Sequence, residues 1–217
     1  MKLYINILGL SGSGKTSLVK KKEYIYNRYC NVHLTNYGKK GLKEKIINNL
    51  KYNFKNPNEK KEIIKILKIF KEQSNEINRL ENYIFKINII NKTLIHKKII
   101  EYNKNVIIDE GVLSLFDNLI IHPKFIDKHY DIKRYLDTLT VLPSHIIYIS
   151  ETTDNLIKRY YDRNNKPWKL NENYNLEVYF KKALIEYDKY IDTLVNNYNI
   201  TIINKNNIES VISQNKK

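Results

Sequence analysis

The chain has one cysteine and no long apolar run, and these two absences exclude several classes of protein. Cys30 has no second cysteine to pair with, so an internal disulfide is excluded, and this cysteine usage fits a reducing compartment. No stretch approaches the about eighteen consecutive apolar residues of a membrane-spanning helix. The apolar run near residue 3 is too short for a signal peptide. We therefore expect a soluble, cytoplasmic protein that does not bind a membrane.

Arginine is also scarce, although the chain is strongly basic. The formal net charge is +15, and only five of the 38 basic residues are arginines: Arg28, Arg79, Arg134, Arg159 and Arg163. Lysine shares A/T-rich codons with Asn, Ile and Tyr, which are also frequent in the chain, so mutational bias explains most of the charge, and nucleic-acid binding is possible but not favoured. Where arginine does occur, it is expected where a planar, bidentate cation is needed, as on phosphate.

Residues 3–16, LYINILGLSGSGKT, combine a short apolar strand, a glycine-rich turn and the start of a helix. The segment Gly9–Thr16 matches G-x-x-x-x-G-K-[ST] at every fixed position, which predicts a phosphate-binding loop. In such a loop, backbone N–H groups and the helix N-terminus face phosphate oxygens. Lys15 is predicted to reach the β- and γ-phosphates, and the Thr16 hydroxyl is predicted to bind Mg²⁺. The predicted nucleotide-binding residues are Gly9, Ser11, Gly12, Ser13, Gly14, Lys15, Thr16 and Ser17.

The remaining pattern predicts one α/β domain over residues 1–217. Strands are predicted at 3–8, 31–37, 106–108, 145–149 and 199–203, and helices at 15–26, at 125–139, after a cap at Thr152, Thr153 or Asp154, and at 176–194. Between the second and third strands, residues 42–102 show apolar stripes at helical spacing. This stretch is longer than one crossover needs, so it predicts an inserted helical subdomain with lysines on its outer faces.

The third predicted strand ends in two carboxylates, Asp109 and Glu110. Open α/β sheets place ligands at the carboxyl ends of their strands. Asp109 is therefore predicted to complete the magnesium side of the site. Glu110 either activates an acceptor hydroxyl or a water, or only binds a nearby basic side chain.

Arg159 and Arg163 lie four residues apart on one predicted helix face, before a polar loop that extends to Asn175. Two arginines so spaced can reach one anion together, and a polar loop can close over a bound nucleotide. The alternative is an ordinary surface ion pair with Asp154 or Asp162. We favour contact with a transferring phosphoryl group, because guanidinium charge suits its dispersed negative charge.

The motifs GLSGSGKT, VIIDEG, LIKRYYDRNNKP and ITIIN, in this order, resemble the P-loop nucleoside and nucleotide kinase-like group, and the resemblance spans nearly the whole chain. It implies a three-layer αβα fold with a five-stranded parallel sheet of order 2-3-1-4-5. It also implies a helical acceptor-binding insertion at 42–102, a lid at 159–175, and the use of ATP and Mg²⁺. Asp-Glu-Gly at 109–111 differs from the Asp-Arg of thymidylate kinases and the Glu-Arg-Ser of deoxynucleoside kinases, so the acceptor is not identified.

The expected function is transfer of the γ-phosphoryl group of ATP to a nucleotide, nucleoside or other small hydroxyl or phosphate acceptor, with Lys15, Asp109, Glu110, Arg159 and Arg163 as catalytic candidates. Three alternatives remain: a hydrolytic P-loop ATPase with an assembly or motor role, a polynucleotide 5′-hydroxyl kinase that uses the basic surface, and a GTP-dependent switch. The switch is least favoured, because residues 204–207 lack the aspartate that reads guanine.

Overall fold

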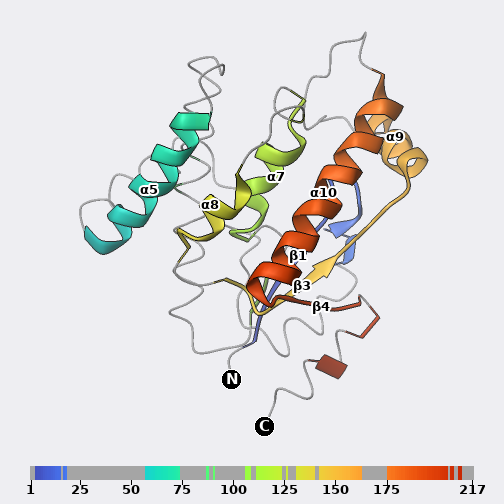
Figure 1. The fold of residues 1–217 in the computed structure, drawn as a ribbon. Helices are drawn as coiled ribbons and strands as arrows, with labels where there is room; N and C mark the ends of the chain where they lie inside the picture. Colours follow the sequence, from blue (N-terminus) through green and yellow to red (C-terminus); the bar gives the residue numbers. More distant parts are fainter. Residues whose placement is uncertain are drawn as a thin grey trace. The chain divides into compact units, whose positions relative to one another are not determined.

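The structure, a computed structural model, describes residues 3–15, 17–18, 57–73, 87, 90, 106–108, 111–123, 126, 131–139, 142–162, 175–204, 206–207 and 210–211. The chain divides into two compact units. Figure 1 labels their helices and strands. The first, here called the sheet unit, comprises residues 1–32, 104–129 and 143–217, and the second, the helical unit, comprises residues 33–103 and 130–142.

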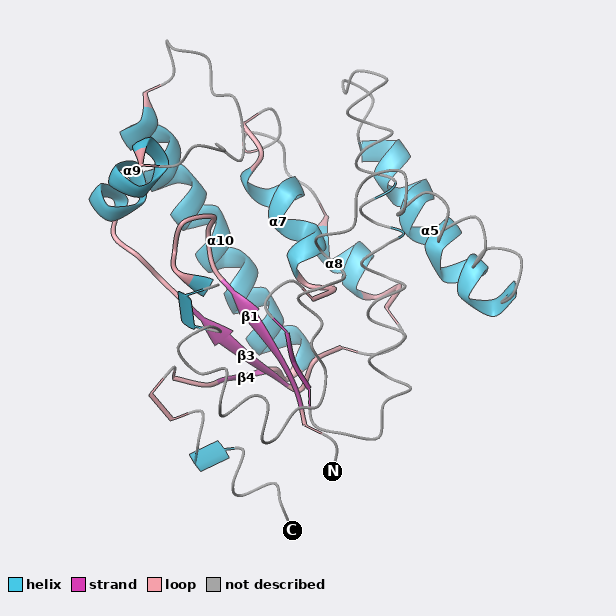
Figure 2. Cartoon of the chain, turned by 180° about the vertical axis from the view of Figure 1, so that it is seen from behind, coloured by secondary structure: helices cyan, strands magenta, loops and turns pink. Residues whose placement is uncertain are grey.

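A parallel β-sheet forms the centre of the sheet unit (Figure 2). Its described strands are β1 (Tyr4–Leu8), β2 (Val106–Ile108), β3 (His145–Tyr148) and β4 (Thr201–Ile202), in the spatial order β2-β1-β3-β4. Register pairs Ile5 with Ile107 on one side and with His145 on the other. The predicted α/β class with a parallel sheet is confirmed. The predicted strand at 31–37 lies outside the described residues, so the five-stranded order stays a prediction.

The central strand β1 is buried along its whole length, with side chains alternating between the two sheet faces. One face carries a cluster of buried apolar residues: Leu3, Ile5, Ile7, Ile147, Ile149 and Ile203, with Leu18 and Val211 packed against it. The opposite face is covered by α10, as Figures 1 and 2 show from two sides. Burial on both faces explains why β1 is an almost continuous apolar run.

Helix α10 (Leu176–Tyr198) packs against α7 (Ser114–Ile121) and α9 (Thr153–Tyr161). The side chain of Asn175 caps the N-terminus of α10 by accepting hydrogen bonds from the backbone N–H groups of Glu177 (3.0 Å) and Val178 (3.2 Å). The helix buries a stripe at helical spacing that includes Tyr179, Phe180, Ala183, Tyr187, Tyr190, Ile191 and Leu194. It ends at Asn199, whose φ of 52° is left-handed. The predicted helix at 176–194 is confirmed.

In the helical unit, α5 (Pro57–Gln73) packs against α8 (Ile132–Leu136). The predicted apolar stripe of α5 is confirmed, since Ile63, Ile66 and Phe70 are buried. The predicted outer lysines, where their side chains are described, are exposed: Lys61, Lys65, Lys68 and Lys71. No described helix is both long and apolar enough to cross a membrane.

The predicted helix at 125–139 is wrong in its extent. Its described part is the five-residue helix α8, which begins after Asp131 and is followed by a turn at 137–138. The carboxylate of Asp131 accepts a hydrogen bond from Arg134 N (3.1 Å) and so starts a new helix at this point. Apolar spacing alone does not reveal such an interruption, because the buried Tyr135 and Leu136 fit a longer stripe equally well.

Candidate functional site

The predicted phosphate-binding loop directly follows the carboxyl end of β1. Gly12 and Gly14 have φ values of 102° and 100°, a conformation that side chains with a Cβ rarely adopt. Ser13 N donates to Leu10 O (3.0 Å), and Leu18 N donates to Gly14 O (2.9 Å) at the start of the following helix. Because the helix begins directly behind the turn, its N-terminal N–H groups lie at the loop. This backbone can receive an anion.

Lys15 lies against the same loop. Its Nζ donates to the carbonyl of Gly9 and to that of Leu10, the latter at 3.2 Å. The ammonium group therefore lies over the first two residues of the loop, held by their carbonyl oxygens. A cation held there can reach an anion bound by the loop, as the motif predicts.

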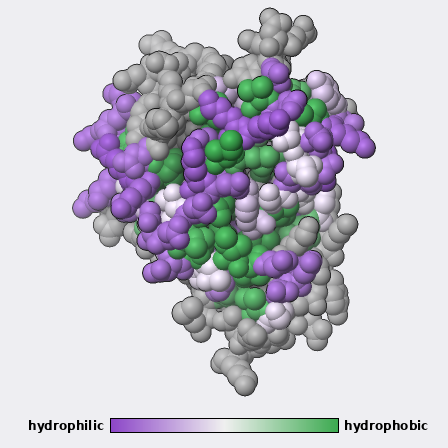
Figure 3. Space-filling view, turned by 45° about the vertical axis from the view of Figure 1, so that its right-hand side comes forward, coloured by the Kyte–Doolittle hydropathy of each residue, from purple (hydrophilic) through white to green (hydrophobic). Residues whose placement is uncertain are grey.

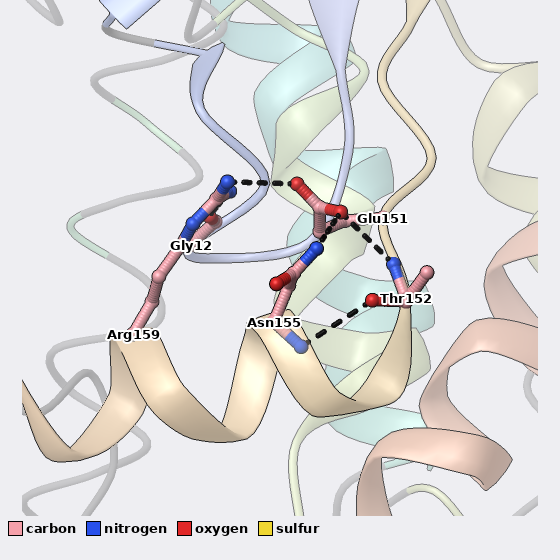
Figure 4. A network of polar contacts seen from close by, with 5 residues as sticks. All are labelled: Gly12, Glu151, Thr152, Asn155 and Arg159. Atoms are coloured by element: carbon pink, nitrogen blue, oxygen red, sulfur yellow. Dashed lines mark hydrogen bonds and ion pairs between the residues drawn. The ribbon is translucent and has the colours of Figure 1, made fainter.

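Arg159 reaches the loop from α9 (Figure 4). Its Nη1 donates to Gly12 O at 2.6 Å, and its Nη2 lies 2.9 Å from Oε2 of Glu151. The structure therefore places the predicted Arg159 beside Lys15's loop, although 147 residues separate Arg159 from Gly12. Arg159 thus forms an ion pair, as the alternative also expected, but its partner is Glu151 rather than Asp154 or Asp162.

Glu151 follows the carboxyl end of β3 and is fixed by the first turn of α9. Its Oε1 accepts hydrogen bonds from Asn155 Nδ2 (2.8 Å) and from Thr152 N (3.1 Å). The Asn155 hydrogen bond, followed by the Thr152 N–H and the nearby Arg159, lowers the pKa of Glu151 below its ordinary value. The Thr152 hydroxyl caps α9 by accepting from Asn155 N (3.3 Å), which selects Thr152 among the three predicted caps. Glu151 is therefore anionic at neutral pH.

The first glycine of the loop is held from the other side by α10. Gly9 N donates to the hydroxyl of Tyr187 (3.0 Å), and this hydroxyl donates to Asp117 Oδ1 of α7 (2.8 Å). Tyr187 is fully buried and stacks on Tyr148 at the end of β3, with ring centroids 5.8 Å apart. Burial and the nearby Asp117 raise the pKa of Tyr187 well above its ordinary value, so the hydroxyl keeps its proton.

The buried Asn6 of β1 lies beside Ile108, the last residue of β2. Asn6 Nδ2 contacts Ile7 O (3.2 Å) and Ile108 O (3.4 Å). A Cβ on Gly111 would lie 2.2 Å from Asn6 Oδ1, so any other residue there would force the buried Asn6 side chain to move. Gly111 O in turn accepts from Ser114 Oγ (2.7 Å). The residues on either side of Asp109 and Glu110 therefore have fixed partners: Ile108 O contacts Asn6, and Gly111 O accepts from Ser114.

Several predicted site residues lie outside the described part of the chain: Thr16, Asp109, Glu110, Arg163 and all of the predicted lid between residues 163 and 174. The described ones, Gly9, Ser11, Gly12, Ser13, Gly14 and Lys15, form the loop or its helix start, and Ser17 is exposed in the helix. Within the described ranges, no group of three or more His, Cys, Asp or Glu side chains could hold a metal ion. The magnesium site at Thr16 and Asp109 therefore stays a prediction.

Sequence reasoning missed three residues at this site: Asn6, Glu151 and Tyr187. Two of them carried a signal. Asn6 is a polar residue inside an otherwise apolar strand, and Glu151 follows the carboxyl end of a predicted strand, where ligand-binding residues gather. Tyr187 fitted the apolar stripe of its helix, and nothing in the sequence pattern connects its hydroxyl with Gly9.

Comparison with known proteins identifies a shared fold. No family model and no curated protein matches the chain. Among solved structures, deoxyadenosine kinase from M. mycoides with bound dATP is similar over 99% of this chain and 100% of that chain, with 16% identity and a TM-score of 0.52. The same enzyme with bound dCTP aligns at 18% identity and a TM-score of 0.48, covering 99% of this chain and 96% of that chain. At this identity, the likeness to the dATP complex is one of fold.

Proposed function

We propose that the protein is a P-loop phosphotransferase that moves the γ-phosphoryl group of ATP to a nucleoside, nucleotide or other small hydroxyl or phosphate acceptor. The observation that carries the proposal is the contact between Arg159 and the phosphate-binding loop. Nη1 of this arginine, which belongs to a helix far along the chain, lies 2.6 Å from Gly12 O in the loop that also carries Lys15. A second cation beside the loop favours chemistry at the phosphates over nucleotide binding alone. A phosphoryl group in transfer can use such a cation, because its charge spreads over several oxygens.

The described residues then have separate roles. The loop backbone binds the β- and γ-phosphates, and Lys15 and Arg159 stabilise the negative charge that moves between donor and acceptor. Tyr187 keeps the start of the loop in place through Gly9 N. Transfer to a hydroxyl also releases its proton, and we assign its uptake to Asp109 or Glu110. Mg²⁺, held by Thr16 and Asp109 in this proposal, would neutralise phosphate charge.

A deoxynucleoside is the first acceptor to test, since the deoxyadenosine kinase of M. mycoides shares the fold. We place acceptor recognition in residues 42–102 and closure over the nucleotide in residues 159–175. The proposal also keeps purine and pyrimidine nucleosides, their monophosphates and 5′-hydroxyl oligonucleotides as candidates, because the Asp-Glu-Gly at 109–111 does not select among them.

The test is release of ADP from MgATP by purified protein, measured with and without each acceptor. Phosphotransfer predicts ADP release that depends on one acceptor class, with phosphorylated acceptor formed in equal amount. Hydrolysis that is equally fast without any acceptor, and that collapses in Glu110→Gln, would instead identify an ATPase. If only oligonucleotides stimulate turnover, and their binding weakens steeply with salt, the basic surface is functional.

A further inference from the structure

The carboxylate of Glu151 is more constrained than a surface carboxylate usually is. Oε1 accepts hydrogen bonds from Thr152 N and Asn155 Nδ2, and Oε2 contacts Arg159 Nη2 (Figure 4). Its side chain is 18% exposed. Because the first turn of α9 holds one oxygen, the other oxygen has a defined position from which to hold Arg159.

Arg159 depends on this carboxylate for its own position. Its side chain is 43% exposed and reaches from α9 to Gly12 O and to Glu151 Oε2. A guanidinium group has five N–H donors, so these two contacts leave donors available for a second anion. An arginine side chain loses conformational entropy when it is held in one orientation, and the contacts with Gly12 O and Glu151 Oε2 together offset this cost. Without the fixed carboxylate, Arg159 would therefore lose its preferred orientation.

The spacing of the pair argues against an ordinary helix-surface ion pair. Partners on one helix face lie three or four residues apart, as Glu186 and Lys189 do in α10. Glu151 and Arg159 lie eight residues apart, and Glu151 precedes the helix. The contact joins the end of β3, the second turn of α9 and the loop after β1, which are three segments brought together by the parallel sheet.

We propose that Glu151 is a positioning residue, which holds Arg159 against the phosphate-binding loop so that its remaining N–H groups face the phosphates of a nucleoside triphosphate. The proposal rests on the phosphotransfer function proposed above. Glu151 itself touches neither nucleotide nor acceptor. Its role is to keep the arginine at the loop before the nucleotide binds, so that little ordering remains at the moment of reaction.

The test compares Glu151→Gln, Arg159→Ala and the double variant with the unaltered protein. Glutamine can still accept the hydrogen bonds from Thr152 N and Asn155 through its Oε1, so α9 keeps its first turn, while the negative charge opposite Arg159 is lost. The matched control is Glu186→Gln, which removes a carboxylate 2.7 Å from Lys189 on α10.

Three readouts are combined. In protein without nucleotide, hydrogen exchange of a peptide that covers the loop should be faster in each single variant than in the unaltered protein. The double variant should exchange at the same rate as the single variants. Acceptor-dependent kcat should fall roughly 10-fold in Glu151→Gln with the acceptor KM unchanged, and the effects should not add in the double variant. The affinity for MgATP should fall in the same non-additive manner. The control should change none of the three.

Two outcomes would overturn the proposal: unchanged loop exchange and MgATP affinity in Glu151→Gln, or effects of the two substitutions that simply add. If no acceptor supports turnover in the unaltered protein, the phosphotransfer proposal fails. Loop exchange and MgATP affinity then still decide whether Glu151 positions Arg159, so the two failures are distinguishable.

Discussion

The two units of the molecule bury different kinds of side chain. In the sheet unit, polar groups lie in the interior beside the phosphate-binding loop, among them Asn6, Ser13 and the hydroxyl of Tyr187. In the helical unit, the described side chains of α5 bury an apolar stripe together with Glu62 and expose lysines. Buried polar groups need partners in fixed directions, whereas an apolar stripe needs only shape and volume. The buried positions of the sheet unit therefore require particular residue types, whereas those of the helical unit require mainly the right spacing of apolar residues.

The surface of the described residues is mixed. Figure 3 shows hydrophilic side chains beside several apolar areas on the described part of the surface in that view. The exposed large apolar side chains are Ile64, Tyr161, Val178, Ile185 and Ile202. Single exposed apolar residues of this kind are normal for a protein surface. The contrast between the units thus concerns their interiors, and the predictions below test it there.

The largest expected effect on stability is in α5. Phe70 is fully buried, so Phe70→Ala should lower the free energy of unfolding of this helix by about 3–5 kcal/mol, through lost burial and the cavity left behind. Native-state hydrogen exchange of α5 peptides measures it. Ile64→Ala, at a position that is 51% exposed in the same helix, is the control and should cost much less. Equal costs at both positions would contradict the description of α5 as an amphipathic helix.

The sheet unit should lose stability in alkali. Burial raises the pKa of Tyr4, Tyr187 and Tyr190 above the ordinary tyrosine value, and Asp117 adds to the effect at the last two. A raised folded-state pKa stabilises the fold below the unfolded value of about 10, and this stabilisation is lost as pH rises further. At about pH 11, each of these tyrosines should lower the free energy of unfolding by about 1.4 kcal/mol.

Urea unfolding of the sheet unit followed between neutral pH and this alkaline range measures the loss. Tyr187→Phe should make the stability less dependent on pH, because one of the three groups no longer titrates. An unfolding midpoint that does not move above the ordinary tyrosine pKa would show that these hydroxyl groups ionise in the folded protein.

Lys15→Ala should remove most of the activity with little change in stability. Loss of one preorganised cation at a phosphoryl group costs roughly 10²- to 10³-fold in kcat. Acceptor-dependent ADP release measures it, and Lys189→Ala, an exposed lysine paired with Glu186 on α10, is the control. Unchanged turnover in Lys15→Ala would remove the loop from the proposed mechanism.

Tyr187→Phe tests whether the buried polar contacts of the sheet unit carry stability. The variant keeps the ring and its stacking on Tyr148, but it leaves Gly9 N–H without its hydroxyl partner. An unpaired buried donor costs about 1–3 kcal/mol. Thermal or urea unfolding measures the change, with Tyr161→Phe as control because Tyr161 is 64% exposed. If both variants are equally stable, the contact with Gly9 contributes nothing.

The smallest expected effect is at the end of α10. Asn199 has a left-handed conformation, so Asn199→Ala should destabilise the sheet unit by about 1 kcal/mol, and Asn199→Gly should not. The difference between the two unfolding free energies is the measurement. Alanine as stable as glycine at this position would indicate that the helix end rearranges.

Local sequence patterns were enough to predict several elements of this protein. The glycine spacing at 9–14 predicted a turn with Lys15 behind it, and the apolar periods at 63–70 and 176–194 predicted helices that the structure contains. These features depend on residues within a few positions of one another, so a local pattern is sufficient. It was insufficient at 125–139, where the carboxylate of Asp131 interrupts the predicted helix.

The contacts of distant residues with the loop depend on how the chain folds in three dimensions. Arg159 contacts Gly12 from 147 residues away, and the hydroxyl of Tyr187 contacts Gly9 from 178 residues away. Glu151 and Asn155 were polar residues without an assigned role until the sheet placed the end of β3 beside the end of β1. Parallel strands bring their carboxyl ends to one edge, and the long connections between them leave no short-range pattern from which such contacts could be predicted.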